Sequence, residues 1–199
     1  MKRVFVLSIL VLAAFVCFSN VSSADNFGIG SVLEDFTLSD INNKPLAFKD
    51  LEGKKGTVIV FVSAQCPVVK AYNERISQIA ADYKDKGINF VGINPNSTEY
   101  AADKFEWMKA HHVEHYKFPV LVDKGQVITD KLGATATPEM YLFDANNKLV
   151  YHGAIDNDRN GTNITNPHLR TALDEFLAGK TITKAETKAI GCSVKRTAE

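Results

Sequence analysis

This sequence has no excess charge of either sign, and it contains little cysteine. The 199 residues include 23 basic and 23 acidic side chains, so the formal net charge is +0. A neutral chain with no basic block is a poor candidate for binding nucleic acid, because contacts to the phosphates need a concentrated cationic surface. Three cysteines are too few for a disulfide scaffold or for a four-thiolate zinc site. Phosphate-binding glycine motifs and serine-nucleophile motifs are missing as well.

Long hydrophobic runs are few, and one of them opens the chain. Lys2 and Arg3 precede an apolar stretch over 4–18, which small residues at 22–24 follow. A basic start, an apolar middle and small residues before a cleavage point are typical of a signal peptide, here 1–24. The apolar stretch is shorter than the ~20 residues that a bilayer core requires, so we expect no stable membrane span.

This leader predicts an exported protein. A lipoprotein would use Cys17, but the branched Val16 stands where a small residue is usual, so we expect Cys17 to leave with the leader. The two remaining cysteines, Cys66 and Cys192, are an even number and can form a disulfide in an oxidising compartment. Because the leader is short and the domain is lean, we expect a bacterial periplasm or cell envelope, or secretion.

Strands and helices alternate along 25–179, which we interpret as one domain, whereas 180–199 carries little apolar material and forms a tail. The expected strands are 36–38, 46–48, 57–62, 88–93, 118–122, 140–143 and 149–152, and the expected helices are 71–86, 99–110, 126–132 and 169–178. This alternation, which closes with a hairpin and a helix, predicts an α/β sandwich with a mixed central sheet and helices on both faces.

The strongest chemical signal is Cys66, which lies between the strand at 57–62 and the helix that follows it. A thiol at a helix N-terminus faces unpaired backbone N–H groups and the positive end of the helix dipole, and both favour the thiolate. Pro67 suits the first helical turn, because it has no N–H group to leave unpaired. The plainer alternative is a buried structural cysteine, a common fate of an isolated one.

The second signal is the run Thr137-Pro138-Glu139, directly ahead of the strand at 140–143. A proline in a tight turn before a strand that pairs with the central one fits a cis peptide bond. The carboxylate of Glu139 could accept a proton from Cys66. The alternative for Glu139 is a surface-exposed position at the start of a strand.

Together these residues resemble the thioredoxin-like fold, and within it the redoxin branch of peroxiredoxin-like proteins and exported thiol–disulfide oxidoreductases. The resemblance covers about residues 27–179. It implies that Cys66 is the active-site cysteine and that the cis-proline loop Thr137-Pro138 packs beside it, offering backbone groups to a bound thiol or peptide. Ser63 matches the hydroxyl residue that peroxiredoxins keep three positions before their peroxide-reacting cysteine.

Three features depart from that family. Thioredoxins and most exported reductases have a second cysteine three positions after the first, where this chain has Val69. Peroxiredoxins have a proline seven residues before the cysteine, where this chain has Ile59. They also place an arginine near the start of a later strand, which the run 137–140 does not supply. The chain therefore matches neither pattern completely.

Cys192 is the candidate for the missing thiol. It lies in a small apolar island, Ile190-Gly191-Cys192, within the polar tail, and the glycine lets the backbone approach another surface closely. As a resolving thiol it would attack a sulfenic acid or a mixed disulfide on Cys66. The alternatives are a purely structural disulfide that pins the tail, or two cysteines that never meet.

The remaining polar clusters have simpler interpretations. His111, His112 and His115 include an i, i+4 pair that could face a metal ion, but no acidic ligand motif accompanies them. We therefore expect a solvated helix end and no metal site. Asp156 and Asp158 lie in a polar loop to which we assign no role.

The sequence thus predicts an exported thiol oxidoreductase. Cys66 would attack a disulfide or a peroxide as the thiolate, and Cys192 would resolve the product. The other expected site residues are Ser63, which would support the thiolate, and Pro67, Thr137, Pro138 and Glu139, which would shape the binding surface. We expect no cofactor, and as partners a thiol/disulfide protein or a small hydroperoxide together with an external dithiol reductant.

Two other functions stay open. A true peroxidase would consume hydroperoxide faster than it exchanges disulfides, and the missing arginine counts against it. A non-enzymatic binding module of the same fold would hold a partner or a metal ion in the cleft beside Cys66, and the missing second cysteine favours it. Serine substitution of Cys66 separates these functions, because a binding module keeps its ligand when the thiol is removed.

Overall fold

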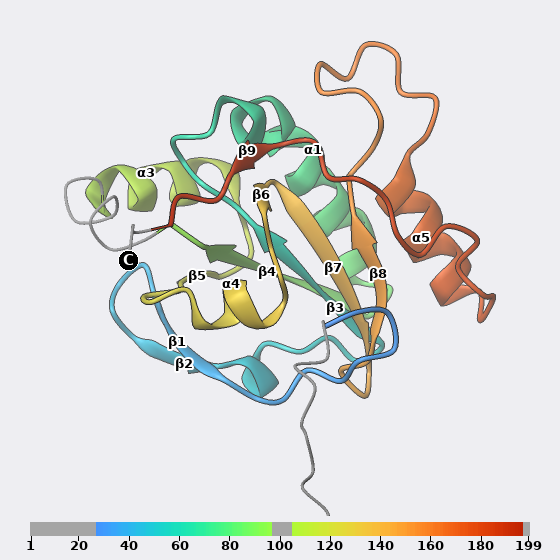
Figure 1. Ribbon diagram of the computed structural model, residues 1–199, viewed down its shortest axis with the longest axis horizontal. Coiled ribbons are helices and arrows are strands. Elements are labelled where there is room, and N and C mark those ends of the chain that lie inside the picture. Colours follow the sequence, from blue (N-terminus) through green and yellow to red (C-terminus); the bar gives the residue numbers. More distant parts are fainter. Residues whose placement is uncertain (1–26, 97–104, 197–199) are drawn as a thin grey trace, which may run out of the picture.

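The computed structural model describes residues 27–96 and 105–196 (Figure 1). The predicted signal peptide, 1–24, lies outside this part of the chain, as does the first part of the helix predicted at 99–110. Within the described ranges, no helix combines the length and the apolar character needed to cross a membrane.

The centre of the fold is a seven-stranded mixed sheet in the order β2-β1-β5-β4-β3-β7-β8. Its strands are β1 (Thr37–Asp40), β2 (Pro45–Ala47), β3 (Gly56–Phe61), β4 (Ile88–Asn94), β5 (Val120–Val122), β7 (Glu139–Asp144) and β8 (Leu149–Gly153). Two short strands, β6 (Ala136–Thr137) and β9 (Cys192–Ser193), form a separate antiparallel pair. β3 is parallel to β4 and antiparallel to β7, so the two strands predicted to be internal, β3 and β4, are confirmed as internal.

Helices cover both faces of this sheet (Figure 1). The helical segments are η1 (Phe48–Asp50), α1 (Pro67–Lys84), α3 (Phe105–His115), α4 (Val127–Lys131) and α5 (His168–Leu177). Val58 and Val60 of β3 belong to the core that α1 and α5 cover, whereas Ile59 and Phe61 belong to the core under α4. This division follows from the strand itself, because successive side chains point to opposite faces. The predicted α/β sandwich is therefore confirmed.

Helix α1 begins four residues earlier than the predicted start at Ala71. Cys66 is its N-cap residue and Pro67 occupies the first turn, so the helix starts directly at the cysteine. α1 ends at Lys84, two residues before the predicted end. Gly87 then takes a φ of +92°, a conformation that glycine adopts without the steric cost of a Cβ.

After α5 the chain returns across the domain as the tail over 180–196, drawn in red in Figure 1. The backbone of His152 in β8 donates to the carbonyl oxygen of Ala185 at 2.9 Å and accepts the N–H of Thr187 at 3.0 Å. Gly153 has a φ of +138°, and a Cβ there would overlap the backbone of Thr187. The tail can therefore lie directly against the edge of β8 before it reaches β6.

Candidate active site

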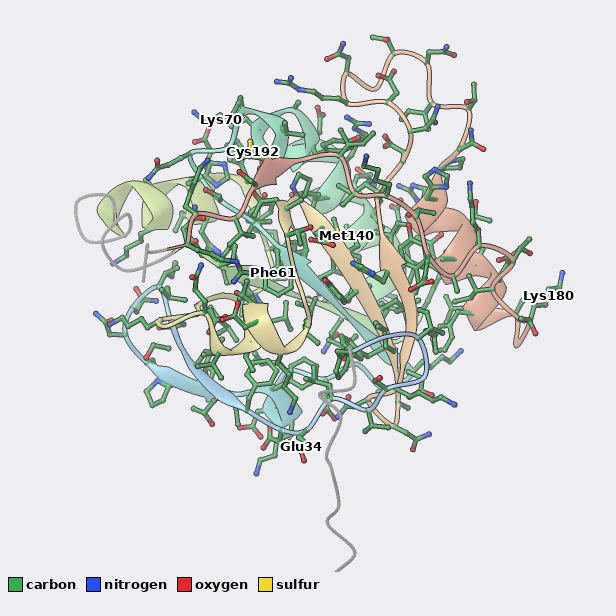
Figure 2. All side chains as sticks on the ribbon, viewed as in Figure 1. Glu34, Phe61, Lys70, Met140, Lys180 and Cys192 are labelled. Carbon is green, nitrogen blue, oxygen red and sulfur yellow. A yellow bond between two sulfur atoms is a disulfide. The ribbon has the colours of Figure 1, made fainter. Side chains whose placement is uncertain are left out.

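The two cysteines of the predicted pair are joined. Cys66 and Cys192 form a disulfide, with their Cα atoms 6.0 Å apart and a sequence separation of 126. Figure 2 labels Cys192 on the tail, where the tail passes the first turn of α1. The sequence left open whether these residues meet, and the structure brings them together.

Backbone groups at the start of α1 hold Cys66. The N–H of Val69 donates to its sulfur at 3.5 Å, and the N–H of Cys66 donates to the carbonyl oxygen of Ser63 at 3.1 Å. The residue is only 4% exposed. In the reduced protein the helix N-terminus would favour the thiolate, whereas burial would oppose it. The helix-start position of Cys66 is confirmed, and its catalytic role stays a prediction.

The predicted cis-proline loop lies beside both cysteines of the disulfide. The Thr137–Pro138 peptide bond is cis. The carbonyl oxygen of Thr137 lies 3.2 Å from the sulfur of Cys66, and Thr137 is also the register partner of Cys192 in the β6–β9 ladder. Cys192 therefore lies in a short strand, β9, which pairs with β6 directly before the cis-proline.

Gly191 allows this close approach of the tail. A Cβ on Gly191 would overlap the backbone of Thr137, so no larger residue fits without a shift of one strand. The expectation that this glycine permits a close backbone contact is confirmed.

Two buried side-chain amides, which no sequence motif marks, hold the tail beyond the disulfide. Asn96 accepts the backbone N–H of Lys195 at 3.1 Å and donates to the hydroxyl of Ser63 at 2.9 Å. Gln126 donates to the carbonyl oxygen of Lys195 at 3.1 Å and to that of Pro95 at 2.6 Å. The N–H and the carbonyl group of Lys195 are thus both hydrogen-bonded, here to two side chains and not to the backbone of a neighbouring strand.

The backbone of Gln126 has an unusual conformation. Its φ is +60°, in the left-handed region that residues other than glycine seldom occupy, and the residue is only 6% exposed.

Ser63, expected to support the thiolate, binds the amide of Cys66 through its carbonyl group and is linked to the tail through Asn96.

Glu139 is buried, so the alternative of a surface-exposed strand start is wrong. Its carboxylate accepts the backbone N–H groups of Thr135 and Ala136 at 2.8 and 2.9 Å, and a hydrogen bond from Nε2 of His152 at 2.6 Å. Burial alone would raise the pKa of Glu139, but these three hydrogen bonds outweigh it and lower the pKa below the usual value. Glu139 therefore fixes the segment that carries β6.

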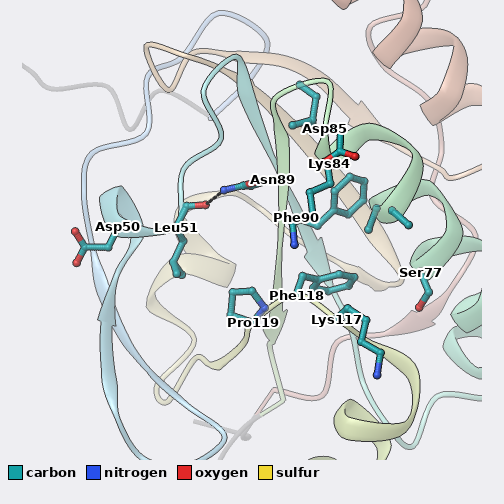
Figure 3. A pocket seen from close by; sticks show the side chains of 13 residues that line it. Asp50, Leu51, Ser77, Lys84, Asp85, Asn89, Phe90, Lys117, Phe118 and Pro119 are labelled. Atoms are coloured by element: carbon teal, nitrogen blue, oxygen red, sulfur yellow. Dashed lines mark hydrogen bonds between the residues drawn. The ribbon is translucent and has the colours of Figure 1, made fainter.

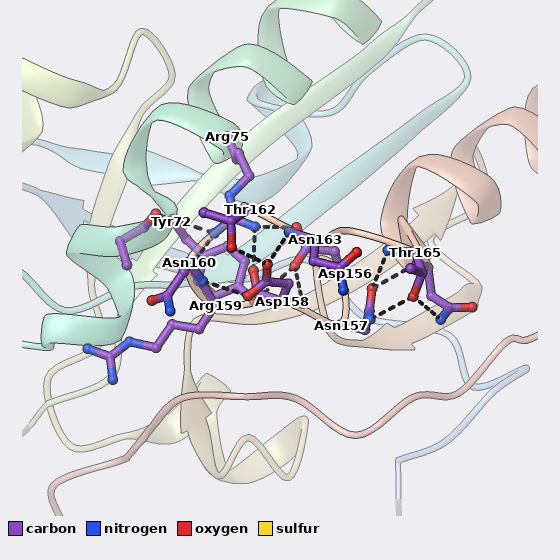
Figure 4. A network of polar contacts seen from close by, with 12 residues as sticks. Tyr72, Arg75, Asp156, Asn157, Asp158, Arg159, Asn160, Thr162, Asn163 and Thr165 are labelled. Carbon is purple, nitrogen blue, oxygen red and sulfur yellow. Dashed lines mark hydrogen bonds and ion pairs between the residues drawn. The ribbon is translucent and has the colours of Figure 1, made fainter.

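The loop that begins at Asp156, for which we predicted no role, is anchored on α1 (Figure 4). Arg75 and the buried Asp156 form an ion pair at 2.6 Å. The guanidinium group also donates to the carbonyl oxygens of Asp158, at 2.7 Å, and Arg159. The hydroxyl of Tyr72 donates to Asp156 at 3.0 Å. This network ties the loop to the helix that starts at the cysteine.

The histidines of α3 also differ from the expectation of a solvated helix end. α3 continues to His115, and Nε2 of His111 lies 2.9 Å from the amide nitrogen of Asn73 in α1. The hydroxyl of Tyr116 donates to the amide oxygen of Asn73 at 2.6 Å, so the amide nitrogen is the donor to His111. Burial, and next the charge of His115, lower the pKa of His111 to about 4. Among the residues that the structure describes, no three acidic, histidine or cysteine side chains are arranged to hold a metal ion.

A cavity of about 460 Å³ lies at the end of α1 remote from the disulfide (Figure 3). The side chains of Phe90, Phe118, Lys84 and Lys117 contribute to its lining, and neither cysteine does. We therefore look for redox chemistry at the start of α1, not in this cavity.

Comparison with known proteins gives consistent results. A family model described as AhpC/TSA family matches residues 29–152, more than half of the chain. A thiol-disulfide oxidoreductase ResA from Bacillus thuringiensis (strain Al Hakam) is 28% identical over 151 residues, which cover 73% of this chain and 83% of that protein.

Two solved structures have the same fold over most of their length. An uncharacterized conserved protein from Geobacillus kaustophilus is 34% identical with a TM-score of 0.80, and the match covers 88% of this chain and 95% of that one. A hypothetical protein from Sinorhizobium meliloti 1021 is 32% identical with a TM-score of 0.79, covering 86% and 96% of the two chains.

The family match extends from the segment before β1 into β8, and so it contains Cys66 and the cis-proline loop. Cys192 and the rest of the tail lie beyond it. The chain belongs to the AhpC/TSA family, and its fold is the thioredoxin-like fold of the redoxins.

Proposed function

We propose that this protein is a thiol-based oxidoreductase whose redox-active pair is Cys66 and Cys192. The observation that carries the proposal is the disulfide itself, which joins a helix N-cap to a strand paired with the cis-proline loop. The relatives named thiol-disulfide oxidoreductase support it as well.

The chemistry is a two-electron cycle. In the reduced protein one cysteine thiolate attacks a substrate disulfide, one substrate sulfur leaves as a thiolate, and a mixed disulfide remains. The second cysteine then attacks this mixed disulfide, releases the other substrate sulfur, and closes the Cys66–Cys192 bond. An external dithiol reopens that bond and is itself oxidised to a disulfide, and each sulfur released takes up a proton according to its pKa.

We assign the other expected site residues to shaping this centre. Pro67 begins the helix directly after the cysteine, and the carbonyl group of Ser63 binds the amide of the same cysteine. Thr137 and Pro138 present the backbone beside the sulfur. Glu139 does not contact the sulfurs in this assignment; its carboxylate positions the cis-proline loop by binding the backbone N–H groups of Thr135 and Ala136.

We propose a location in the bacterial periplasm or cell envelope, or secretion. The basic and apolar pattern of 1–24 supports export, and an oxidising compartment preserves a disulfide of this kind. The proposed partners are a thiol/disulfide protein and an external dithiol reductant, with a small hydroperoxide as the alternative oxidant. N-terminal sequencing of the exported protein tests the location, and the expected first residue is Asp25.

Turnover with a protein disulfide such as insulin, in the presence of dithiothreitol, tests the function. Wild-type protein should accelerate the reduction of insulin. Its own Cys66 and Cys192 should alternate between two free thiols and a disulfide. The variants Cys66→Ser and Cys192→Ser should each lose this cycling. The proposal would be contradicted if the protein reduced no substrate disulfide and its Cys66–Cys192 disulfide stayed intact in dithiothreitol.

The same variants separate the rival functions. If hydroperoxide is consumed faster than disulfides are exchanged, the protein is a peroxidase. If Cys66→Ser retains full binding of a partner while wild-type protein shows no turnover, the protein is a binding module of the same fold.

A further inference from the structure

The two cysteines of the disulfide differ in exposure to solvent. Cys66 is buried at the start of α1, whereas Cys192 is partly exposed and lies between two exposed residues, Gly191 and Ser193. A thiol that opens a disulfide has to reach one of the two sulfurs, and access is one of the factors that decide which. Access from solvent therefore favours Cys192.

The tail that covers Cys66 is held by contacts that do not involve the disulfide. On one side of the bond, Thr187 donates its N–H to the carbonyl oxygen of His152 at 3.0 Å and accepts the N–H of Ala154 on its hydroxyl at 2.8 Å. On the other side, the N–H of Val194 donates to the carbonyl oxygen of Thr135 at 2.9 Å. Hydrogen bonds thus fix the tail both before and after the tail cysteine.

The last described residues of the tail add further contacts. Lys195 is bound through both backbone groups by the buried amides of Asn96 and Gln126. Arg196 donates to the carbonyl oxygen of Ala134 at 3.0 Å and pairs with Asp130. None of these contacts involves the disulfide, so we expect the tail to stay docked over Cys66 when the S–S bond is cut.

The two sulfurs also differ as leaving groups. Cys66 is the N-cap of an 18-residue helix, and its sulfur accepts the N–H of Val69. Cys192 lies in a two-residue strand. Burial opposes negative charge on Cys66, but the helix N-terminus and the N–H of Val69 favour it, and the sulfur with the more stable thiolate leaves faster. Access and leaving ability therefore favour the same direction of attack.

We infer that an incoming thiol attacks Cys192 and that Cys66 is the leaving group. The new bond joins the sulfur of the partner to Sγ of Cys192, the Cys66–Cys192 bond breaks, and its electron pair stays on Cys66 as a thiolate. The second thiol of a dithiol reductant then attacks the partner sulfur, Cys192 leaves and takes up a proton, and the reductant departs as a disulfide.

In the reverse direction a substrate disulfide exchanges first with Cys192, and the Cys66 thiolate then attacks Cys192 and releases the substrate. This inference rests on the proposed function and deepens it. It reverses the two roles that the sequence suggested, since the tail cysteine meets the partner and the cysteine at the start of the helix resolves.

A monothiol tests the inference directly, because it cannot complete the second step. Oxidised protein is mixed with glutathione, the reaction is stopped with acid at increasing times, and free thiols are blocked with N-ethylmaleimide before peptide mapping. At the earliest times we expect glutathione on Cys192 and maleimide on Cys66, in about tenfold excess over the opposite arrangement. Only the earliest times show which cysteine is attacked first, because glutathione bound to one cysteine can later move to the neighbouring one by thiol–disulfide exchange.

A variant tests whether the docked tail is what protects Cys66. Gln126→Gly removes the amide that binds Lys195 and suits the left-handed backbone at this position. The share of glutathione on Cys66 should rise in this variant. Asn146→Ala removes an exposed amide from the β7–β8 turn and should keep the wild-type distribution.

Glutathione found mainly on Cys66, or equally on both cysteines, from the earliest times would overturn the inference and leave the proposed redox function intact. An unchanged distribution in Gln126→Gly would overturn the protective role of the tail. A disulfide that neither glutathione nor dithiothreitol opens would contradict the proposed function, and the inference would fall with it.

Discussion

The carboxylate of Glu139 accepts a hydrogen bond from Nε2 of His152 at 2.6 Å, directly after the cis-proline. The same carboxylate accepts the backbone N–H groups of Thr135 and Ala136. His152 in turn binds the tail through both of its backbone groups. This hydrogen bond thus connects the segment that carries β6 to the strand that binds the tail.

Replacing Glu139 by glutamine should loosen this connection. A glutamine side chain keeps an oxygen for the two backbone amides but carries no charge, and its NH2 group faces the imidazole nitrogen that donates to the carboxylate. Hydrogen bonds to a charged group contribute about 1.5–3 kcal/mol, so we expect a loss of about 2 kcal/mol in the free energy of unfolding. Denaturant titration measures this loss. The control is Glu114→Gln, an exposed residue of α3, and equal stability of the two variants would contradict the role assigned to Glu139.

Gly191→Ala should displace the tail from β6. The added Cβ overlaps the backbone of Thr137, so one strand has to move and Cys192 moves with it. We expect slower closure of the disulfide after reduction, together with a loss of about 1–3 kcal/mol in unfolding free energy from overpacking. Timed alkylation with a mass-tagged maleimide measures the closure. Ser193→Ala, an exposed neighbour, is the control, and equal closure rates in the two variants would count against this docking geometry.

The parts of this fold that the sequence predicted are those with a local pattern. The run 57–62 is apolar without interruption and forms an internal strand, β3. Cys66-Pro67 at a strand-to-helix junction predicted the thiol at the helix start, and Thr137-Pro138 ahead of a strand predicted the cis bond. Each of these features depends on residues that are neighbours in sequence.

The parts that the sequence did not predict depend on contacts between distant residues. Gln126 binds Lys195 across 69 positions of sequence, and no spacing rule marks either residue. Glu139 was open to interpretation as a surface acid, because its burial requires His152 on the next strand. The early start of α1 follows from its cap, whereas the apolar periodicity that predicted the helix begins one turn later.

Loss of the disulfide should destabilise the fold without unfolding it. The bond closes a loop across a separation of 126 residues, and the chain-entropy model gives a stabilisation of at most about 5 kcal/mol for a loop of this length. We expect Cys192→Ser to lose up to that amount relative to oxidised wild type. Reduced wild-type protein should match the variant, and dithiothreitol should leave the variant unchanged. Equal stability of oxidised and reduced wild-type protein would contradict this expectation.

Acid should destabilise the protein in part through His111. Because its pKa in the folded state is about 4, below the ordinary value of 6.5, the unfolded chain binds the proton more readily. The contribution is therefore fully present above pH 6.5 and is lost as the pH falls from 6.5 towards 4. His111→Gln keeps an acceptor for Asn73 without a titrating group, so its stability should fall less over this range. Thermal unfolding at several pH values measures the slope, and identical slopes would contradict the assignment.

Two arginine ion pairs of equal length should differ in energetic importance. Arg75–Asp156 and Arg170–Asp82 both have N···O distances of 2.6 Å, but the side chains of the first pair are 20% and 4% exposed and those of the second 37% and 33%. Arg75→Met leaves a buried carboxylate without its cation, which costs about 3–5 kcal/mol. Arg170→Met removes a pair that solvent screens, which costs about 1 kcal/mol or less. Denaturant titration compares them, and limited proteolysis should cut the loop after Asp156 sooner in Arg75→Met alone. Equal losses in the two variants would show that burial does not determine the strength of this anchor.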